Sequence, residues 1–533
     1  MALIGILVLL VAVGNTATVV GPRIADNPRC KAYPGTARWP SKEVWSAFNK
    51  TVNGKLFQPT LPGGVCHMGQ SSYSKTACAQ VAKAWLTYDF HLEDPISVMT
   101  NQWANDTCLP DPNTPCSPTG YPAYVIDAAD VRNIKAGLDF GSGATLGNIY
   151  TALDQHNQAI VGGNCLTVSL GGYLTGGGHS ILSPWHGLAA DQVVEVEVVT
   201  PDGKFQKVNQ DQNPDLFWAL CGGGGATFGV ITGFTIRTIP SPKLKVATWL
   251  AVSEPSAPFL SDLIGYVASQ TPYLMNSGVA GYSAVNLSIS NPIPDSGLPR
   301  TVAGFRGYMA LQDNSDPEAF NTIFQPMNDT INCRWSGKAM FRSSVTEYRS
   351  FLEFIKVNYY QDAVGDNRYL VSRLLGMDAL QNEKALGEAL VSGSKSFGGL
   401  DFCLVGGKGV QEAKPLGGSN SVNSAWRSAY VHAMTETMGV ALNSAATDEA
   451  VSALDANWEP IRKLTPSSGC YLNEASPYEK NWQQAYWGSN YDRLLKIKRE
   501  TDPHDVFWCK PCVGHDRWHQ LQSGQLYTGN FKR

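Results

Sequence analysis

The segment from Val161 to Ser180 limits what this chain can fold into more than any other part of the sequence. It reads VGGNCLTVSLGGYLTGGGHS, and its glycines fall in tight clusters. Glycine tolerates positive φ angles and lets a ligand approach the backbone closely. Consecutive exposed N–H groups form a nest that binds anions such as a pyrophosphate. A second cluster at 222–225, continued by Gly229, predicts a second such loop, so we expect a dinucleotide to lie along the backbone.

Neither glycine cluster matches the Rossmann fingerprint for NAD. That fingerprint needs a strand before the glycines, a helix after them and an acidic residue about twenty positions further on. Gly224 and Gly229 instead precede a predicted strand, which excludes NAD. For either cluster alone, the alternative is that the glycines only make turns.

Length and charge narrow the remaining classes of protein. The chain has 533 residues, of which 43% are hydrophobic and 16% are charged, and this predicts a globular protein of two packed domains. Its net charge of -4 provides no basic excess to attract nucleic acid and no acidic tail. A nucleic-acid partner is therefore not expected.

The N-terminus predicts export. Residues 2–13 are apolar but too few to span a bilayer, and small residues follow around Ala17, as in a secretory signal peptide. The alternative is an uncleaved anchor, because the usual positive charge before the apolar run is missing. No later stretch is apolar enough to span a membrane. Twelve cysteines and four N-glycosylation sequons agree with secretion, and the sequons are at Asn49, Asn105, Asn286 and Asn328.

Changes in residue composition and pattern divide the chain into five segments. After a predicted signal peptide (1–17), residues 18–119 are rich in Pro, Gly, Asn and Cys and predict an irregular cap tied by disulfides. Cys66 with Cys78, and Cys108 with Cys116, are the candidate pairs. The remaining segments are an α+β domain at 120–240, a second domain at 241–469 and a tail at 470–533, which we expect to return to the α+β domain.

Runs of β-branched and alternating residues predict strands, and a 3.6-residue spacing of apolar residues predicts helices. In the α+β domain these patterns predict strands at 121–126, 193–199 and 230–237 and helices at 128–140 and 149–156. In the second domain they predict strands at 244–252, 302–311 and 369–375 and helices at 346–357 and 448–464. The second domain is therefore predicted to be an antiparallel sheet backed by helices.

Six ordered motifs resemble those of a known family. They are GGNC at 162–165 running to GGG at 176–178, GLAADQ at 187–192, EVVTPDG at 197–203, DLFWAL at 215–220, the glycines of 222–229, and a C-terminal piece with YLNE at 471–474, GSNY at 488–491 and DP at 502–503. They resemble the FAD-linked oxidases of the berberine bridge enzyme-like group, within the vanillyl-alcohol oxidase superfamily. The Cys-rich start is similar to that of fungal secreted members.

The resemblance implies an α+β fold made of a PCMH-type FAD-binding domain and a substrate domain whose antiparallel sheet covers the isoalloxazine ring. It implies oxidation of a small organic alcohol, amine or activated C–H, with O2 taking the electrons from the flavin. Secondary-metabolite biosynthesis is the expected setting. The motif positions imply FAD contacts for Gly162, Gly163, Cys165, Thr167, Gly171, Gly172, Gly176, Gly177, Gly178, His179, Gly229, Val230 and Asn490. No metal is implied.

Five of the family positions carry reactive side chains. In family members with a doubly tethered flavin, a cysteine at the position of Cys165 bonds the ring; the alternative here is a buried thiol or a half-disulfide. His179 faces the flavin region or only packs behind it. Tyr471, if its pKa is lowered, or Glu474 would be the catalytic base, and Asn473 would hold a polar group of the substrate. The alternative for these last three is structural hydrogen bonding.

A Cys-x-x-Cys motif lies in the tail, at Cys509 and Cys512 after Trp508. It imitates a thioredoxin site, but the βαβ context of that site is missing. We therefore expect a structural disulfide.

The resemblance fails after Phe140. In the family, the helix predicted at 128–140 is followed by a strand and a glycine-histidine motif whose histidine bonds the flavin 8α-methyl group. Here Phe140 runs directly into Gly141, where the sequence resembles a later part of the family, and the one Gly-His-Asp, at 514–516, lies in the tail. Relative to the family, the first FAD lobe is therefore expected to be shortened, and the histidyl link has no candidate. Three explanations are open: an incorrect gene model, a shortened isoform and a degenerate paralogue. The free-energy cost of losing several buried strands would exceed the typical stability of a protein, about 5–15 kcal/mol.

The sequence as a whole predicts a secreted FAD-linked oxidase of a small organic molecule. The competing hypothesis is a non-catalytic secreted remnant of the same fold, because part of the flavin site is missing.

Overall fold

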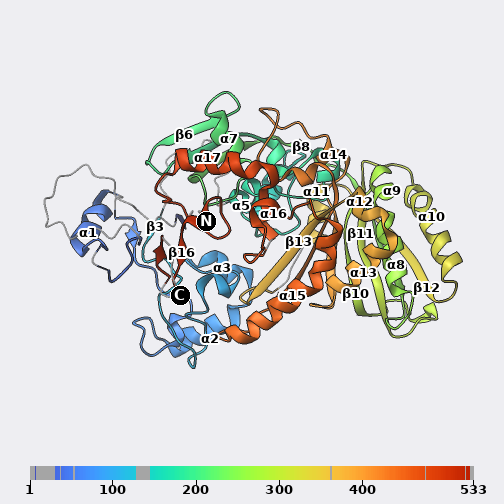
Figure 1. Ribbon diagram of the computed structural model, residues 1–533, viewed down its shortest axis with the longest axis horizontal. Coiled ribbons are helices and arrows are strands. Elements are labelled where there is room, and N and C mark those ends of the chain that lie inside the picture. Colours follow the sequence, from blue (N-terminus) through green and yellow to red (C-terminus); the bar gives the residue numbers. More distant parts are fainter. Residues whose placement is uncertain are drawn as a thin grey trace.

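The computed structural model describes residues 6–7, 30–36, 38–51, 54–127, 144–359, 363–474, 476–521 and 524–528. Figure 1 shows a large sheet with its helices at one end of the molecule, a smaller glycine-rich region above its centre, and a cap at the opposite end. Helices and antiparallel sheets are mixed along the chain, so the predicted α+β class is confirmed. No helix within the described ranges is both long and apolar enough to cross a membrane.

The glycine-rich region is built on a three-stranded antiparallel sheet of order β6-β5-β7. Its central strand is β5 (Val193–Val199), where Val196 and Val198 are fully buried. The flanking elements are α4 (Leu146–Asp154), β4 (Gln158–Ala159), α5 (Leu170–Thr175), α6 (Ser183–His186), β6 (Phe205–Asn209), α7 (Pro214–Leu220), β7 (Val230–Ile236) and β8 (Ile239–Pro240). Their apolar side chains form one core with the C-terminal helix α17 (Tyr491–Thr501).

The second region is a seven-stranded antiparallel sheet of order β12-β9-β11-β10-β14-β15-β13. Its strands are β9 (Leu244–Ser253), β10 (Ala280–Ser290), β11 (Thr301–Gln312), β12 (Ala339–Tyr348), β13 (Arg368–Gly376), β14 (Gly399–Leu404) and β15 (Ala429–Met438). This is the predicted antiparallel sheet.

Alternation along the strands divides this sheet into two faces. One face carries side chains such as Trp249, Phe305 and Phe402, which belong to a core shared with the covering helices. Those helices are α8 (Leu260–Ser269), α9 (Thr271–Asn276), α10 (Ala319–Arg334), α12 (Met377–Gln381), α13 (Glu383–Gly393) and α15 (Ser444–Leu464). The other face packs toward the glycine-rich region, because Val246 and Ala280 belong to the core of that region.

The cap is more helical than the sequence predicts. It contains α1 (Lys42–Thr51), α2 (Lys75–Ala84) and α3 (Tyr88–Glu93). Its small sheet has β3 (Val125–Asp127) at the centre, paired with β1 (Ile6–Leu7) on one side and β2 (Leu56–Phe57) on the other. The expectation of an irregular cap is therefore wrong in part: Ser74 caps α2 by accepting a hydrogen bond from the Ala77 N–H. The disulfides Cys66–Cys78 and Cys108–Cys116 confirm both candidate pairs.

One predicted helix is misplaced. The sequence predicts a helix at 346–357, but β12 continues to Tyr348 and α11 runs from Phe351 to Asn358. Ser350 starts the helix, since its side chain accepts a hydrogen bond from the Glu353 N–H. The predicted helix at 128–140 and the junction after Phe140 lie outside the described residues.

Candidate functional site

A row of polar side chains crosses the sheet face that is turned to the glycine-rich region. Tyr308 on β11 lies opposite Tyr282 on β10, Tyr282 opposite Cys403 on β14, and Cys403 opposite His432 on β15. Residues directly opposite on neighbouring antiparallel strands share one face. The four side chains therefore form a continuous strip, which we call the cross-strand row.

The glycine turn after α5 places His179 against this row. Gly177 and Gly178 have φ angles of +119° and +73°, and a Cβ on Gly178 would lie 2.7 Å from the side chain of Ala189. Only glycine fits such a turn without strain. His179 Nδ1 lies 3.3 Å from the Tyr282 hydroxyl, and the His179 ring is 5.2 Å from the ring of His432.

The C-terminal YLNE motif closes the site from the other side. Asn473 Nδ2 donates to the Tyr471 hydroxyl at 2.8 Å and to the Gly172 carbonyl at 3.1 Å. A Cβ on Gly176 would lie 2.3 Å from the Asn473 amide, so this glycine leaves the room that Asn473 occupies. The structure thus brings together these predicted residues with His179.

Glu474 lies between two histidines. Its Oε2 is 3.4 Å from His179 Nε2 and 3.5 Å from His432 Nδ1. His432 is fully buried and His179 nearly so, while the Glu474 side chain is 31% exposed. Burial opposes ionisation of Glu474, but the two histidines outweigh it and hold the pKa of its carboxyl below the usual value. Burial lowers the pKa of His432 to about 3, so this imidazole is neutral at physiological pH and can favour the carboxylate only through the dipole of its ring N–H, not as a cation.

The phenols of the site do not titrate near neutral pH. Burial raises the pKa of Tyr471 far above its usual value, and the nearby Glu474 carboxylate raises it further. Burial likewise raises the pKa of Tyr282. The idea that Tyr471 has a lowered pKa is therefore wrong for this structure, and Glu474 is the anionic group of the site.

Cys165 is a free thiol beside the cross-strand row. It is partly exposed, and its Sγ lies 3.3 Å from the Thr167 hydroxyl. The half-disulfide alternative is thus excluded. The preceding residue, Asn164, reaches across to the Tyr308 hydroxyl with Nδ2 at 3.5 Å.

The backbone around Cys165 fits a cofactor with acceptor atoms. Among the described residues, none accepts a hydrogen bond from the N–H groups of Gly162, Gly163, Asn164 or Cys165. Buried or half-buried N–H groups rarely stay unpaired, and a run of them suits the oxygens and ring atoms of a flavin nucleotide. The site therefore fits FAD, with the free Cys165 thiol as the one nucleophile in this loop.

The second glycine cluster packs against the first. The Gly224 N–H donates to the Thr175 carbonyl, and Gly222, at φ +130°, lies so close to Val422 that a Cβ would be 2.2 Å from its nitrogen. Asn490 Nδ2 donates to the Val422 carbonyl, which links this predicted residue to the same loop. Gly171 accepts a hydrogen bond from Thr175 inside α5.

Gly229 and Val230 are placed differently. A Cβ on Gly229 would contact Val198 and Val199, and Val230 pairs with Val199 at the start of β7. Their recorded contacts are with β5, and the structure does not bring them to the His179 and Glu474 cluster.

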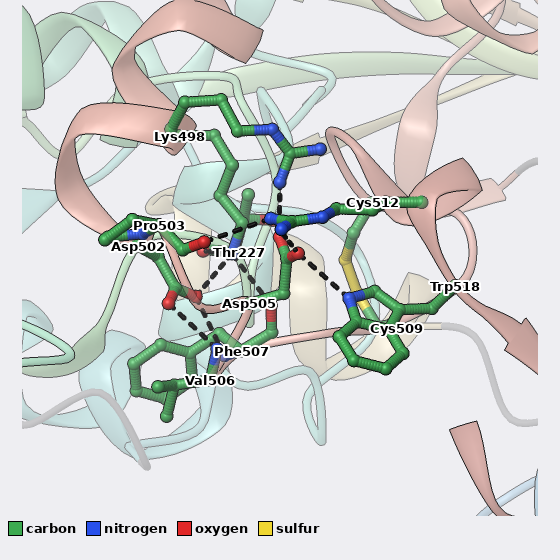
Figure 2. A network of polar contacts seen from close by, with 12 residues as sticks. Thr227, Lys498, Asp502, Pro503, Asp505, Val506, Phe507, Cys509, Cys512 and Trp518 are labelled. Atoms are coloured by element: carbon green, nitrogen blue, oxygen red, sulfur yellow. Dashed lines mark hydrogen bonds and ion pairs between the residues drawn. A yellow bond between two sulfur atoms is a disulfide. The ribbon is translucent and has the colours of Figure 1, made fainter. Parts of the chain in front are cut away.

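The C-terminal tail fixes the second glycine cluster. Lys498 Nζ donates to the Thr227 carbonyl and pairs with Asp502 at 2.7 Å, and both charged side chains are buried (Figure 2). The Cys509–Cys512 disulfide lies against the Gly225 carbonyl, with Cys512 Sγ at 3.6 Å. The prediction of a disulfide here is confirmed.

An ion pair between a buried carboxylate and a partly exposed arginine joins the two regions. Asp191, from the GLAADQ motif, is 3% exposed and accepts hydrogen bonds from both terminal nitrogens of Arg427 at 2.7 and 2.9 Å. Asn420 also donates to Asp191, at 2.7 Å. This bidentate contact fixes the sheet relative to the glycine turn.

Sequence reasoning missed the cross-strand row. Cys403 and His432 lie in strands that the sequence prediction did not include, and Tyr308 lies in a predicted strand but was not singled out. Alternation in VHAMTET, around His432, marks a strand but does not reveal its partner.

Two family models match the chain. The model described as "FAD binding domain" matches residues 125–209, and the model described as "Berberine and berberine like" matches residues 470–514. These matches contain the two ends of the site, the glycine turn with His179 and the YLNE motif.

Several fungal proteins are similar over nearly the full chain. FAD-linked oxidoreductase patO of Aspergillus clavatus is 27% identical over 93% of this chain and 94% of its own length. VAO-type flavoprotein oxidase VAO615 of Thermothelomyces thermophilus is 27% identical over 98% of this chain and 99% of its own length. That alignment extends over 592 positions, more than the 533 residues present, so VAO615 has segments that this chain lacks.

Solved structures show the same fold. The VAO-type flavoprotein MtVAO713 from Myceliophthora thermophila matches with a TM-score of 0.80 at 24% identity, over 94% of this chain and all of its own. MtVAO615 from the same fungus matches with a TM-score of 0.78 at 26% identity and the same coverage. Fold, site and both family models agree: the chain is an FAD-dependent oxidoreductase that is similar to berberine bridge enzyme-like, VAO-type proteins.

Proposed function

We propose that the chain oxidises a small organic alcohol, amine or activated C–H group between the cross-strand row and the glycine turn, and passes the electrons to O2. One observation carries the proposal: Glu474 is an anionic carboxylate in a largely buried polar cluster beside the FAD-binding loop. Such a group is suited to accept a proton from a substrate.

FAD, when bound, takes the hydride that leaves the substrate carbon. The N–H groups of 162–165 and the glycines of α5 and its following turn would hold the nucleotide, and the Cys165 thiol would bond the ring. The remaining predicted contacts, Thr167, Gly229, Val230 and Asn490, are proposed to support these loops.

The chain's own residues handle the proton and the orientation of the substrate. Glu474 takes the proton from the substrate hydroxyl or amine at Oε2, while the hydride leaves as the second part of the same two-electron oxidation. His179 holds this carboxylate from the side of the glycine turn. Tyr471 stays protonated, and Asn473 fixes its hydroxyl by donating a hydrogen bond to it.

Secondary metabolism is the proposed setting. A relative from Penicillium decumbens, 26% identical over 98% of this chain and 99% of its own length, is named bifunctional decalin synthase calF. We also propose passage through the secretory pathway, which the three disulfides support.

The non-catalytic remnant is the second candidate, and the longer alignment with VAO615 is the observation that favours it. Absorbance separates the two. Protein purified from a eukaryotic secretory host should show a flavin band near 450 nm and release hydrogen peroxide with some member of a panel of benzylic alcohols, allylic alcohols, amines and oligosaccharides. Protein that stays colourless after refolding with FAD would establish the remnant.

The base is tested by Glu474→Gln, which keeps the shape of the side chain. Loss of a general base should lower kcat by about 10²–10⁴-fold while the flavin band is retained. Glu412→Gln, at an exposed helix end elsewhere in the substrate domain, is the matched control. Equal turnover by the parent and Glu474→Gln would remove Glu474 from the mechanism.

A further inference from the structure

Resting on the proposed function, we infer that His432 is a positioning residue for Glu474: its Nδ1–H donates to Oε2 and holds this carboxylate ionised and aimed at the substrate pocket. Neither the motifs nor the family models include His432, which lies outside both matched ranges.

His432 is a destabilising residue for a buried strand position. It lies on β15 between Cys403 on one neighbouring strand and Leu374 on the other, and it is fully buried. Neither ring nitrogen forms a hydrogen bond of ordinary length with any described residue. A buried polar group left unpaired costs about 1–3 kcal/mol, so an apolar side chain would stabilise this strand better.

The geometry supplies one partner for the ring. Glu474 Oε2 lies 3.5 Å from Nδ1, and a shift of about 0.5 Å would bring the pair to an ordinary N–H···O distance. His179 reaches the same oxygen from the opposite side, with its own Nδ1 facing the Tyr282 hydroxyl. Two imidazoles therefore converge on one carboxylate oxygen, from two different regions of the molecule.

The other groups around Glu474 carry no charge at physiological pH. They are Tyr173 from α5, Tyr282 from β10, Cys403 from β14 and Tyr471 from its own segment, and burial raises the pKa of each. Within the described part of the chain, His179 and His432 are the groups that favour the ionised carboxylate. Removal of His432 should therefore raise the pKa of Glu474, because burial then acts with less opposition.

Two substitutions separate hydrogen bonding from packing. In His432→Asn the side-chain amide nitrogen takes the place of Nδ1 and can still donate to Glu474, whereas His432→Leu fills the space without a donor. His186→Asn is the control, because His186 bonds Gln312 instead of the cluster. Thermal unfolding of each variant shows first that it is folded.

The first readout needs no substrate. Carbodiimide labels carboxyl groups in their protonated form, so labelling of Glu474 in the holoprotein, followed by mass spectrometry from pH 4 to 8, reports its ionisation. We expect His432→Leu to be labelled at higher pH than the parent, with His432→Asn and His186→Asn close to the parent. Identical labelling profiles for the parent and His432→Leu would overturn the inference, whatever the activity of the enzyme.

The second readout is turnover of the best substrate from the oxidase panel. We expect His432→Leu to lower kcat by roughly 10²-fold, with KM changed less than about 3-fold, and its acid limb to move to higher pH. His432→Asn should recover most of the loss. Equal loss in both variants would assign His432 to packing and overturn the inference.

A metal-binding experiment tests the alternative that the same cluster is a metal site. The nearest ligand atoms of His179, His432 and Glu474 all lie within 4.8 Å of one another, a spacing that a divalent cation would also suit. Dialysed holoprotein should bind no stoichiometric Zn²⁺ by calorimetry. One Zn²⁺ per chain, lost in His432→Asn and Glu474→Gln, would overturn the positioning role.

Discussion

A single glycine decides whether the second glycine loop can approach the segment around Val422. At Gly222 the φ angle is +130°, and a Cβ would lie 2.2 Å from the backbone nitrogen of Val422. Backbone cannot move aside as a side-chain end can, so we predict that Gly222→Ala destabilises the protein by more than about 2 kcal/mol. The midpoint of guanidinium unfolding measures the loss.

Gly69→Ala is the matched control for this prediction. A Cβ on Gly69 meets nothing within 4 Å, and its φ angle is not left-handed, so the free energy of unfolding of Gly69→Ala should stay within about 0.5 kcal/mol of the parent value. If Gly222→Ala behaved like Gly69→Ala, the close approach of the loop to Val422 would be wrong.

Cys165 carries a second prediction at this scale. Its thiol is free, partly exposed and placed beside N–H groups that have no acceptor among the described residues, so we expect it to bond the flavin ring. Acid precipitation of the yellow protein should leave flavin in the pellet, and Cys165→Ala should release it into the supernatant. Cys333→Ala, at an exposed free cysteine on α10, should retain flavin. Flavin released from the parent protein would exclude the bond.

The sequence could predict those site residues that lie within short motifs. The glycines, His179 and Glu474 stand in motifs whose spacing is fixed within a few residues, and the structure gathers most of them. Tyr308, Tyr282, Cys403 and His432 come together only through strand pairing across β11, β10, β14 and β15. Their meeting depends on register over long sequence distances, which local pattern does not determine.

Helix α17 shows how one element holds a glycine loop in place. Lys498, in its last turn, pairs with Asp502, the residue that follows the helix, and Lys498 also donates to the carbonyls of Thr227 and Phe507 (Figure 2). We predict that Asp502→Asn destabilises the protein by about 3–5 kcal/mol, because a buried ammonium then loses its counter-charge. Chemical unfolding with tryptophan fluorescence measures this change.

The same helix offers a control. Glu500 pairs with Lys496 at 3.9 Å on the exposed side of α17. Exposed pairs contribute little, so Glu500→Gln should change the stability by less than about 0.5 kcal/mol. Similar losses for Asp502→Asn and Glu500→Gln would show that the Lys498 pair is not buried as described.

Element boundaries were predicted less well than element types. Strand β5 was predicted at its observed bounds, since its β-branched run ends at a Pro-Asp-Gly turn. Helix α11 was placed too early because the polar edge strand β12 lacks a clear apolar face: Arg342 to Glu347 are all exposed. The Ser350-x-x-Glu353 spacing was the better start signal for this helix.

At the scale of the whole molecule, the site exists only where the two regions meet. The FAD-binding region contributes His179 and Cys165, the sheet contributes the cross-strand row, and the tail contributes Tyr471, Asn473 and Glu474. The sequence predicted both regions and their type, but the contact between them is made by polar pairs such as Asp191 with Arg427. Such pairs form only when the two regions are in contact, so no local sequence pattern predicts them.

His432 lies buried at the boundary between the two regions, and its burial makes the stability of the whole protein depend on pH. The pKa of His432 is about 3 in the folded protein, against about 6.5 in an unfolded chain. Below pH 6.5 the unfolded chain therefore binds a proton that the folded protein rejects. The free energy of unfolding should fall as pH falls from about 6.5 toward 3, by up to about 1.4 kcal/mol per pH unit from this group.

His432→Asn removes this titration while leaving a polar side chain in place. Between pH 7 and pH 5, we predict that the parent loses about 2 kcal/mol more stability than His432→Asn, measured by guanidinium unfolding at the two pH values. Burial also lowers the pKa of His91 and His515, so both proteins keep a residual slope of the same sign. Glu474 does not confuse the comparison, because its pKa is lowered from a value near 4.5 and its stabilising effect is lost only below that pH. If the free energy of unfolding changed with pH in the same way for the two proteins, His432 would not be buried as a neutral imidazole. The boundary between the two regions would then admit water in the folded state.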